Sequence, residues 1–332
     1  MSIAKTVQKS LSIKENRQIE TPKPLEQLRE GELERKRHIC KIMTFTLKYL
    51  TNELINHGFE WLLPVVFSKT TDPLWPDPGA SIEERVEVEI YGNTVRTTQS
   101  MIVHKMVACS LVQPRLFVLS PNVRIEKRER AASGVHAYEF TQLDFESREA
   151  SSKDVRSLVE NVLSGLVANM KTHLRKELAY LGRDDGLTSL CPPFRVCDKR
   201  ELEREYGEAW ETRLLWETRD AMWVTNIPRE FYDFEDEDGR WDNYDLLLPM
   251  YGEVLSGGKR EWEYSKLVKK MQRDNVRQER FKLLLKLAKE KKLKPSAGAG
   301  IGIERLTSWI TGAKHLGETQ LFPRVPGIVY DL

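Results

Sequence analysis

The sequence is poor in the features that mark membrane, secreted and zinc-binding proteins. It has 4 cysteines in 332 residues, and their spacing does not match a zinc site. No apolar run approaches the length that a membrane-spanning helix needs, and the N-terminus has no signal-peptide core. These absences predict a cytoplasmic protein that does not insert into membranes. We expect its thiols to be reduced and buried; they are Cys40, Cys109, Cys191 and Cys197.

The sequence also lacks an excess of charge of either sign. Lys and Arg number 52 and Asp and Glu number 50, which gives a formal net charge of +2. Such a balance provides no strong bulk attraction to nucleic acid. We therefore expect the basic run within residues 261–292 to be a solvated helix face, with contact to nucleic acid as the less favoured alternative.

The apolar residues, 40% of the chain, are enough for a sizeable core. Residues 1–30 are polar and are expected to form a tail. Three segments have apolar residues at helical spacing and are predicted to be helices: 32–57, 151–181 and 261–292. Strands are predicted at 116–119 and 140–145, and a hairpin at Tyr91-Gly92-Asn93. Helices and strands mix without regular βαβ alternation, so the predicted fold class is α+β, an antiparallel sheet flanked by helices.

The most distinctive stretch lies near the C-terminus and reads GAGIGIERL from Gly298 to Leu306. Glycines on alternate residues let the backbone approach a ligand closely. Arg305 follows them and supplies a planar cation that can lie on a purine and reach phosphate oxygens. With the later run Phe322-Pro323-Arg324, this stretch resembles the third motif of class II aminoacyl-tRNA synthetases, in the branch that handles aspartate, asparagine and lysine.

Two further stretches resemble the other motifs of this family. The helix predicted over 32–57, with a short strand ending at Pro64, resembles motif 1, which forms the family's dimer interface and implies a homodimer. Residues 122–146 resemble motif 2, which implies that Arg124 holds the α-phosphate of ATP. Motifs 2 and 3 together imply that Arg124 and Arg305 are catalytic. Without the resemblance, the Arg-Ile-Glu sequence at 124–126 would indicate no more than an exposed ion pair.

The resemblance implies a set of ligand-binding residues. Those expected to bind ATP are Arg124, Glu126, His136, Phe140, Glu253 and Arg305. Phe140 would stack on adenine opposite Arg305, Glu126 would face the adenine edge, and His136 would contact the γ-phosphate. Those expected to bind Mg²⁺ are Asp245, Glu253 and Ser256, whose hard oxygen donors suit this ion. Those expected to bind the amino acid are Lys105 and Arg260, as a carboxylate clamp, and Gln142 and Asp144, on the ammonium group.

The chain departs from the family pattern in several places. The resemblance covers residues 31–332, the predicted catalytic domain, and we expect no OB-fold of the kind that reads the anticodon, since such a module needs on the order of 100 residues. Recognition of tRNA through its anticodon is therefore not expected. Ile102 stands where the family has glutamine, Val135 where it has arginine, and Ala299 where an aromatic residue is common.

These features together resemble the archaeal asparagine synthetase related to asparaginyl-tRNA synthetase. The implied reaction converts aspartate, ATP and ammonia into asparagine, AMP and pyrophosphate. The Lys105/Arg260 clamp would hold the α-carboxylate and present the β-carboxylate to ATP. Free ammonia is the expected nitrogen donor, because we expect no glutaminase domain.

Two alternatives stay open. One is an aminoacyl-tRNA ligase or a paralogue that modifies RNA, and the other is a non-catalytic regulator. The intact ATP residues argue against the regulator. The sequence does not separate aspartate from asparagine as the substrate.

Overall fold

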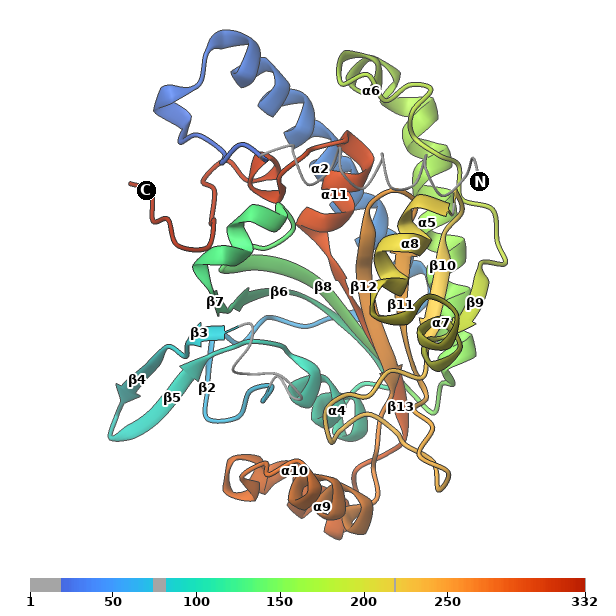
Figure 1. Ribbon diagram of the computed structural model, residues 1–332. Coiled ribbons are helices and arrows are strands. Elements are labelled where there is room, and N and C mark those ends of the chain that lie inside the picture. The colour runs from blue at the N-terminus through green and yellow to red at the C-terminus, as the bar shows by residue number, and fades with distance from the viewer. Residues whose placement is uncertain (1–18, 74–81, 218, 332) are drawn as a thin grey trace.

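The computed structural model describes residues 19–73, 82–217 and 219–331. Its centre is an eight-stranded sheet with the strand order β1-β6-β8-β13-β12-β11-β10-β9 (Figure 1). The two outermost pairings, β1 with β6 and β9 with β10, are parallel, and the pairings between them are antiparallel. The predicted α+β class, an antiparallel sheet with flanking helices, is confirmed.

The elements have the following bounds. The strands are β1 Glu60–Trp61, β2 Phe67–Ser68, β3 Ile82–Glu84, β4 Glu87–Ile90, β5 Asn93–Thr97, β6 Arg115–Val123, β7 Ile125–Glu126, β8 Glu139–Arg148, β9 Arg195–Asp198, β10 Met222–Thr225, β11 Asn243–Leu248, β12 Gly252–Lys259 and β13 Ser296–Gly302. The α-helices are α2 Glu30–Asn56, α4 Ile102–Leu111, α5 Ser152–His173, α6 Arg175–Tyr180, α7 Lys199–Tyr206, α8 Trp210–Glu217, α9 Tyr264–Arg273, α10 Lys282–Lys289 and α11 Ile303–Thr311. Short 3₁₀ helices are η1 Leu25–Gln27, η2 Arg128–Ser133, η3 Gly207–Ala209, η4 Gln278–Phe281 and η5 Leu316–Thr319.

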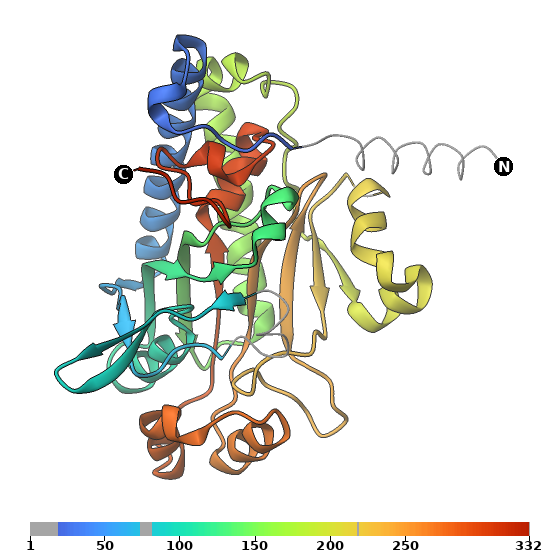
Figure 2. The same ribbon diagram turned by 60° about the vertical axis from the view of Figure 1, so that its left-hand side comes forward.

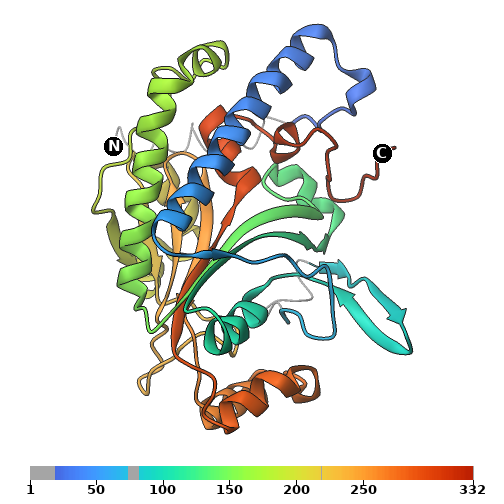
Figure 3. The same ribbon diagram turned by 180° about the vertical axis from the view of Figure 1, so that it is seen from behind.

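The main core lies between the large sheet and the helices on one of its faces. Figure 3 shows α2 and α5 crossing this face. Successive strand residues point to opposite faces, and on β8 the odd positions Leu143 and Phe145 belong to the core with Leu166 of α5. The even positions Gln142 and Asp144 point to the other face, which the main helices leave free for a binding site.

The first predicted helix is confirmed, and the other two are interrupted. Helix α2 ends at Asn56, and Gly58 follows with a left-handed φ of 77°. The predicted helix over 151–181 divides at Leu174 into α5 and α6. The predicted helix over 261–292 divides into α9, η4 and α10, because Asn275 takes a left-handed φ of 52° just after α9.

The basic residues of α10 face solvent as expected, while its leucines other than Leu283 pack inward. Lys282, Lys286 and Lys289 are exposed, and Leu284 is buried in a second cluster with Leu267 of α9. Figure 2 shows this helix pair at one end of the molecule, beyond the ends of the strands.

The predicted hairpin is present as β4 and β5. Tyr91 and Gly92 form its turn, and both have positive φ, 50° and 70°, as a two-residue turn matched to the strand twist requires. The four thiols are free. Cys109 and Cys197 are buried, but Cys191 is exposed, so the expectation of buried thiols is wrong there.

The N-terminal segment is more ordered than a tail where the structure describes it. Residues 1–18 lie outside the described part of the chain, whereas 19–29 run against the C-terminal segment. The Tyr330 hydroxyl donates a hydrogen bond to the carbonyl oxygen of Pro22 at 2.5 Å. Among the described helices, we find none with the length and apolarity to cross a bilayer.

Candidate functional site

The polar face of the large sheet has room for charged side chains because β13 carries glycines there. Gly298, Gly300 and Gly302 pair with Glu146, Asp144 and Gln142 of β8. A Cβ atom on Gly298 would lie 2.2 Å from Glu146 Oε2, and one on Gly300 would lie 2.8 Å from Asp144 Oδ1. Two of the alternate glycines therefore make room for carboxylates of the neighbouring strand, in addition to bringing backbone toward a ligand.

A pocket opens beside this strand. It is lined by all six residues expected to bind ATP, namely Arg124, Glu126, His136, Phe140, Glu253 and Arg305. Gln142, Gly300 and Gly302 also line it. Residues from three distant parts of the sequence thus meet in one cavity.

Arg124 is fixed at one side of the pocket by its own chain. Its Nε and Nη2 atoms donate hydrogen bonds of 3.0 and 2.8 Å to the carbonyl oxygen of Gln99. Its guanidinium carbon lies 5.2 Å from the centre of the Phe140 ring. The cation and the aromatic ring therefore form a preorganised pair at the position where the sequence predicts phosphate and adenine binding.

Arg305 supplies the second cation of the pocket. Its Nη1 donates to the carbonyl oxygen of Glu253 at 3.2 Å and lies 3.5 Å from Glu253 Oε2. Its Nε donates to the carbonyl oxygen of Val135 at 3.3 Å. The backbone of Val135 thus helps to orient Arg305, although its side chain lacks the cation that the family has there.

The missing cation near His136 is supplied by Arg130. The His136 ring makes hydrogen bonds with Arg130 Nη1 at 2.7 Å and with Ser133 Oγ at 2.6 Å. Burial lowers the pKa of His136 to about 3, with further lowering by Arg305 and Arg130. The ring is therefore neutral at pH 7, and any contact with a phosphate would be that of a neutral imidazole.

One carboxylate oxygen of Glu126, Oε2, receives no hydrogen bond from the described residues. This oxygen is buried, and Arg130 Nη1 lies 3.4 Å away. Burial raises the pKa of this carboxyl group. A buried acceptor that lines a pocket is costly unless a ligand satisfies it, which fits a carboxylate at the edge of an adenine amino group.

On the amino-acid side, Lys105 is held away from the pocket. Its side chain is fully buried, and Nζ donates to Asp144 Oδ1 at 2.8 Å and to the carbonyl oxygens of Phe145 and Ala299 at 3.3 Å each. An ammonium group has three donors, so these contacts use all of them. Of the described residues expected to bind the amino acid, Gln142 lines the pocket, whereas Lys105 and Asp144 pair with each other beneath it.

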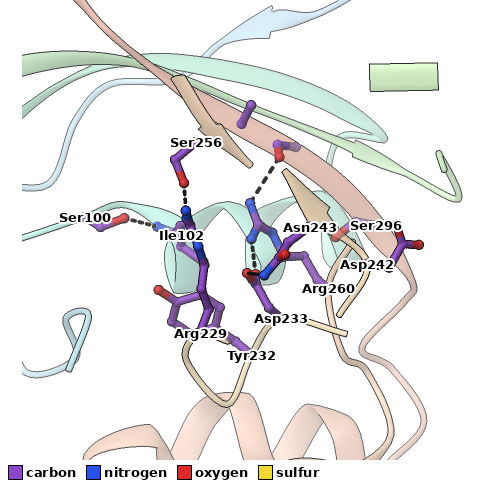
Figure 4. A network of polar contacts seen from close by, with 12 residues as sticks. Ser100, Ile102, Arg229, Tyr232, Asp233, Asp242, Asn243, Ser256, Arg260 and Ser296 are labelled. Carbon is purple, nitrogen blue, oxygen red and sulfur yellow. Dashed lines mark hydrogen bonds and ion pairs between the residues drawn. The ribbon is translucent and has the colours of Figure 1, made fainter. Parts of the chain in front are cut away.

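Arg260 is also buried, and each of its three side-chain nitrogen atoms donates a hydrogen bond (Figure 4). Its Nε donates to Glu146 Oε1 at 3.3 Å, its Nη1 to Asp233 Oδ1, and its Nη2 to the carbonyl oxygen of Gly298 at 3.2 Å. The structure therefore does not present the expected Lys105/Arg260 clamp to a ligand. Carboxylates of β8 and of the segment before β11 neutralise both cations.

Asp245 and Ser256, two of the three expected Mg²⁺ ligands, are neighbours on β11 and β12. The guanidinium of Arg229 donates hydrogen bonds to both, and Figure 4 shows the one to Ser256. Burial raises the pKa of Asp245 to about 6, against the lowering effect of Arg229. In residues 19–73, 82–217 and 219–331, no group of three or more His, Cys, Asp or Glu side chains is arranged to hold a metal ion.

The donor chemistry of this set fits Mg²⁺, but its arrangement does not. Glu253 pairs with Arg305, and Arg229 occupies the oxygens of Asp245 and Ser256. The chain by itself therefore does not assemble the expected three-ligand site. Mg²⁺ is commonly held by one or two carboxylates together with substrate phosphates, for which Asp245 and Glu253 would be the candidates.

The sequence motifs did not indicate three charged residues beside the predicted site residues: Arg130, Arg229 and Asp233. Arg229 and Asp233 lie in the segment 226–234, which reads NIPREFYDF and is the first part of the connection from β10 to β11. The only sequence pattern that could have indicated Arg229 and Asp233 is the dense mixture of charged and aromatic residues between two buried strands. Such a connection is usually solvated, so only the structure reveals that it folds over the sheet.

The comparisons with known proteins agree with this geometry. The family model of the tRNA synthetases class II (D, K and N) matches residues 34–326. An asparagine--tRNA ligase of Thermococcus kodakarensis is 30% identical over 237 residues, covering 65% of this chain and 54% of the relative. An asparagine--tRNA ligase of Pelotomaculum thermopropionicum is 28% identical over 260 residues, covering 72% and 59%. The chain spans little more than half the length of these curated relatives.

Solved structures show the same fold. The asparaginyl-tRNA synthetase from Pyrococcus horikoshii complexed with asparaginyl-adenylate superposes with a TM-score of 0.79 at 23% identity, covering 90% of this chain and 70% of that one. A putative aspartyl-tRNA synthetase from Leishmania major gives a TM-score of 0.69 at 18% identity, with 89% and 66% coverage. At these identities the likeness concerns the fold alone.

Proposed function

Because the chain belongs to the class II tRNA synthetases of the D, K and N group, we propose that it is an AMP-forming ligase that activates aspartate or asparagine as an adenylate. The observation that carries this proposal is the pocket in which Arg124, Phe140 and Arg305 meet. Two arginines and an aromatic ring fit a nucleoside triphosphate, and the buried Oε2 of Glu126 fits the amino group of its adenine base.

The reaction follows from the position of Arg124. A carboxylate oxygen of the amino acid attacks the α-phosphorus of ATP, the bond to the bridging oxygen breaks, and pyrophosphate leaves. Negative charge builds on the α-phosphate oxygens, and Arg124, already fixed by the Gln99 carbonyl, stabilises it without reorganising. Mg²⁺, when bound with ATP, would neutralise charge on the triphosphate. Arg305 would position the adenine and the phosphates.

The second step transfers the acyl group to an acceptor, for which two candidates exist. The relatives named as asparagine--tRNA ligases favour a tRNA hydroxyl. Ammonia, expected from the sequence, is the second candidate, and the loop between Arg124 and Glu139 favours it. This loop is tied to the C-terminal segment, since Tyr138 N donates to the Arg324 carbonyl at 3.0 Å and Leu316 N to the Gly134 carbonyl at 2.6 Å. In the family such a loop contacts the tRNA acceptor end. A loop that is already bonded to the C-terminal segment is less free to do so, which favours ammonia as the acceptor.

The test is ATP–pyrophosphate exchange with each amino acid, followed by acceptor assays. Exchange that depends on aspartate or asparagine supports the adenylation step, and exchange with neither contradicts it. Asparagine formed from aspartate and ammonium, without RNA, selects the synthetase. Aminoacyl-tRNA formed from total tRNA selects the tRNA ligase. Trapping the adenylate with hydroxylamine then identifies the activated carboxylate, because β-aspartyl hydroxamate forms only if the β-carboxylate is attached to AMP.

Arg204→Ala is the matched control for substitutions in the pocket. Arg204 lies on α7, its side chain is 76% exposed, and its ion pair with Glu201 spans 3.9 Å. Exposed pairs of this kind contribute little stability. The Arg204→Ala substitution is therefore expected to leave the rate of ATP–pyrophosphate exchange unchanged.

A further inference from the structure

The segment that forms α9 and α10 carries a concentrated positive charge. Residues 264–294 contain twelve Lys and Arg but only three Asp and Glu, whereas the whole chain has a net charge of +2. The rest of the chain is therefore net negative. A local excess of this kind attracts polyanions even when the overall charge is balanced.

A groove in this segment gathers part of the charge. It lies between the first residue of α9 and the run from η4 through α10, and its lining residues are Tyr264, Gln278, Glu279, Lys282, Leu285, Lys286, Lys289 and Glu290. The three lysines are four and then three residues apart, so they stand on one side of α10. All three are exposed. The row extends roughly 10 Å along the helix axis.

The described residues do not neutralise this row. Lys282 and Lys289 make no ion pair with them, and Lys286 lies 3.9 Å from Glu290, which Lys292 approaches more closely, at 2.8 Å. Like charges three and four residues apart on a helix repel and destabilise it. An anion bound in the groove would remove this repulsion.

The exposed charges of α2 follow a different pattern. Arg37 lies 2.8 Å from Glu30 and 2.5 Å from Glu34, so opposite charges are neighbours there, as is usual for a solvated helix face. The row on α10 lacks this alternation. A solvated face therefore accounts for the charges of α2 but not for those of α10.

Tyr264 adds an aromatic surface to the groove. Its side chain is 38% exposed, and Lys289 Nζ lies 6.0 Å from the centre of its ring. The residue starts α9, which Leu267 anchors in the second core cluster one turn later. An aromatic ring beside a row of lysines is the combination that binds single-stranded nucleic acid, because bases stack on the ring and phosphates contact the cations.

We propose that the groove between α9 and α10 binds a single strand of nucleic acid, with Lys282, Lys286 and Lys289 on its phosphates and Tyr264 stacked on one of its bases. The ligand chemistry is a phosphodiester strand whose bases are accessible, from RNA or from DNA. A duplex fits less well, since its bases are already stacked on each other. The three lysines also favour a strand over a single phosphate group.

This site is separate from the nucleotide pocket. Strand β13 starts at Ser296, on the side of α10, and ends at Gly302, which lines the pocket. Its seven residues span roughly 20 Å. Figure 1 shows α9 and α10 at the opposite end of the molecule from α11. The inference therefore goes beyond the proposed adenylation and does not depend on it.

The test is fluorescence anisotropy of the full chain with labelled oligouridine RNA of about 12 nucleotides, the matching oligothymidine DNA and an RNA duplex, at about 50, 100 and 200 mM salt. Lys282→Gln/Lys286→Gln should weaken binding of the single strands. It should also lower the slope of log Kd against log salt by about 1.4, because each phosphate contact on a single strand contributes roughly 0.7.

Tyr264 gives an independent measurement. Tyr264→Ala should weaken binding of the single strands roughly tenfold or more and leave the salt slope unchanged, because stacking releases no counterions. Tyr264→Phe keeps the ring and should bind within about threefold of wild type. The two kinds of variant therefore separate the electrostatic contribution from the stacking contribution.

Lys153→Gln/Arg204→Gln is the matched control. It removes two exposed positive charges on α5 and α7, outside the groove. The salt slope and the Kd should stay close to those of wild type. The unfolding midpoint, followed by circular dichroism, shows that each variant is folded.

The outcomes are distinct. A tenfold preference for RNA over DNA would identify RNA as the ligand, and equal affinities would indicate binding of either strand. The proposal is overturned if wild type binds neither strand at about 50 mM salt, or if the groove variant and the control have the same slope. An RNA duplex that binds as tightly as the single strand also overturns it. So does a polyglutamate peptide that competes equally well, which would indicate an acidic protein partner. Binding of a strand without any pyrophosphate exchange would refute the proposed function and leave this inference intact.

Discussion

Three alanine substitutions on β13 should have sharply graded effects, although the chemical change is the same. Gly298, Gly300 and Gly302 lie on one face of one strand. An added Cβ would lie 2.2 Å from both Glu146 Oε2 and the Phe145 carbonyl oxygen at Gly298, 2.8 Å from Asp144 Oδ1 at Gly300, and 3.5 Å from Arg305 Cβ at Gly302. The three positions therefore range from a severe overlap to an ordinary contact.

The magnitudes follow from what must move. At Gly298 the backbone oxygen cannot yield, and Glu146 cannot turn away without leaving Arg260, so we expect Gly298→Ala to cost about 3–5 kcal/mol. At Gly300 no backbone atom is overlapped, but Asp144 Oδ1 must shift although it pairs with the buried Lys105, and about 1–3 kcal/mol is expected. Gly302 has a φ of −70°, which any residue adopts. Gly302→Ala should lie within about 1 kcal/mol of wild type, on either side.

Urea denaturation followed by circular dichroism measures these differences as shifts of the midpoint at constant slope. Pyrophosphate exchange adds a functional measurement: Gly300→Ala should raise the KM for the amino acid, and Gly302→Ala the KM for ATP. Equal midpoints for the three variants would refute the account of the glycines as space for β8 side chains. So would a Gly298→Ala variant that is more stable than Gly300→Ala.

Three more outcomes are expected. Arg124→Ala and Arg305→Ala should each lower pyrophosphate exchange roughly a hundredfold or more while leaving the unfolding midpoint nearly unchanged, and near-normal exchange would contradict the site. Burial raises the pKa of Glu304 from 4.5 to about 7. Wild type should therefore lose up to about 3 kcal/mol of unfolding free energy relative to Glu304→Gln as the pH rises from 4.5 to 7.5, because the folded state holds the proton longer. A pH-independent difference would show that folding does not shift the pKa of Glu304. Light scattering at micromolar concentration should give the mass of a dimer. The reason is that Trp61 and Leu63, which follow α2, expose 51% and 82% of their surface. A monomeric mass would contradict a dimer built on this face.

The parts of the fold that follow from local pattern could be predicted. Helix α2 shows its apolar stripe and its terminating Gly58 directly in the sequence, and the β4–β5 turn needs positive φ at Tyr91-Gly92. The break at Asn275 had a local signal, since asparagine is common just after a helix end. The break at Leu174 could not be predicted, because apolar residues continue at helical spacing across it as Met170, Leu174 and Leu178. Whether a helix continues there depends on what its next turn would pack against.

The sequence by itself determined the fold class and the residues expected to bind ATP, because both follow from short motifs with a characteristic spacing. Arg124, Glu126 and Phe140 belong to one hairpin, and Arg305 follows the glycines of β13 directly, so their convergence is a property of local geometry. Tertiary structure alone decided which cations remain open. Lys105 and Arg260 are neutralised by carboxylates from other strands and from a distant connection, while Arg229 reaches the site from a segment without any motif. The charge available to a ligand depends on which oppositely charged groups the folded chain places beside it, and those partners are far apart in sequence.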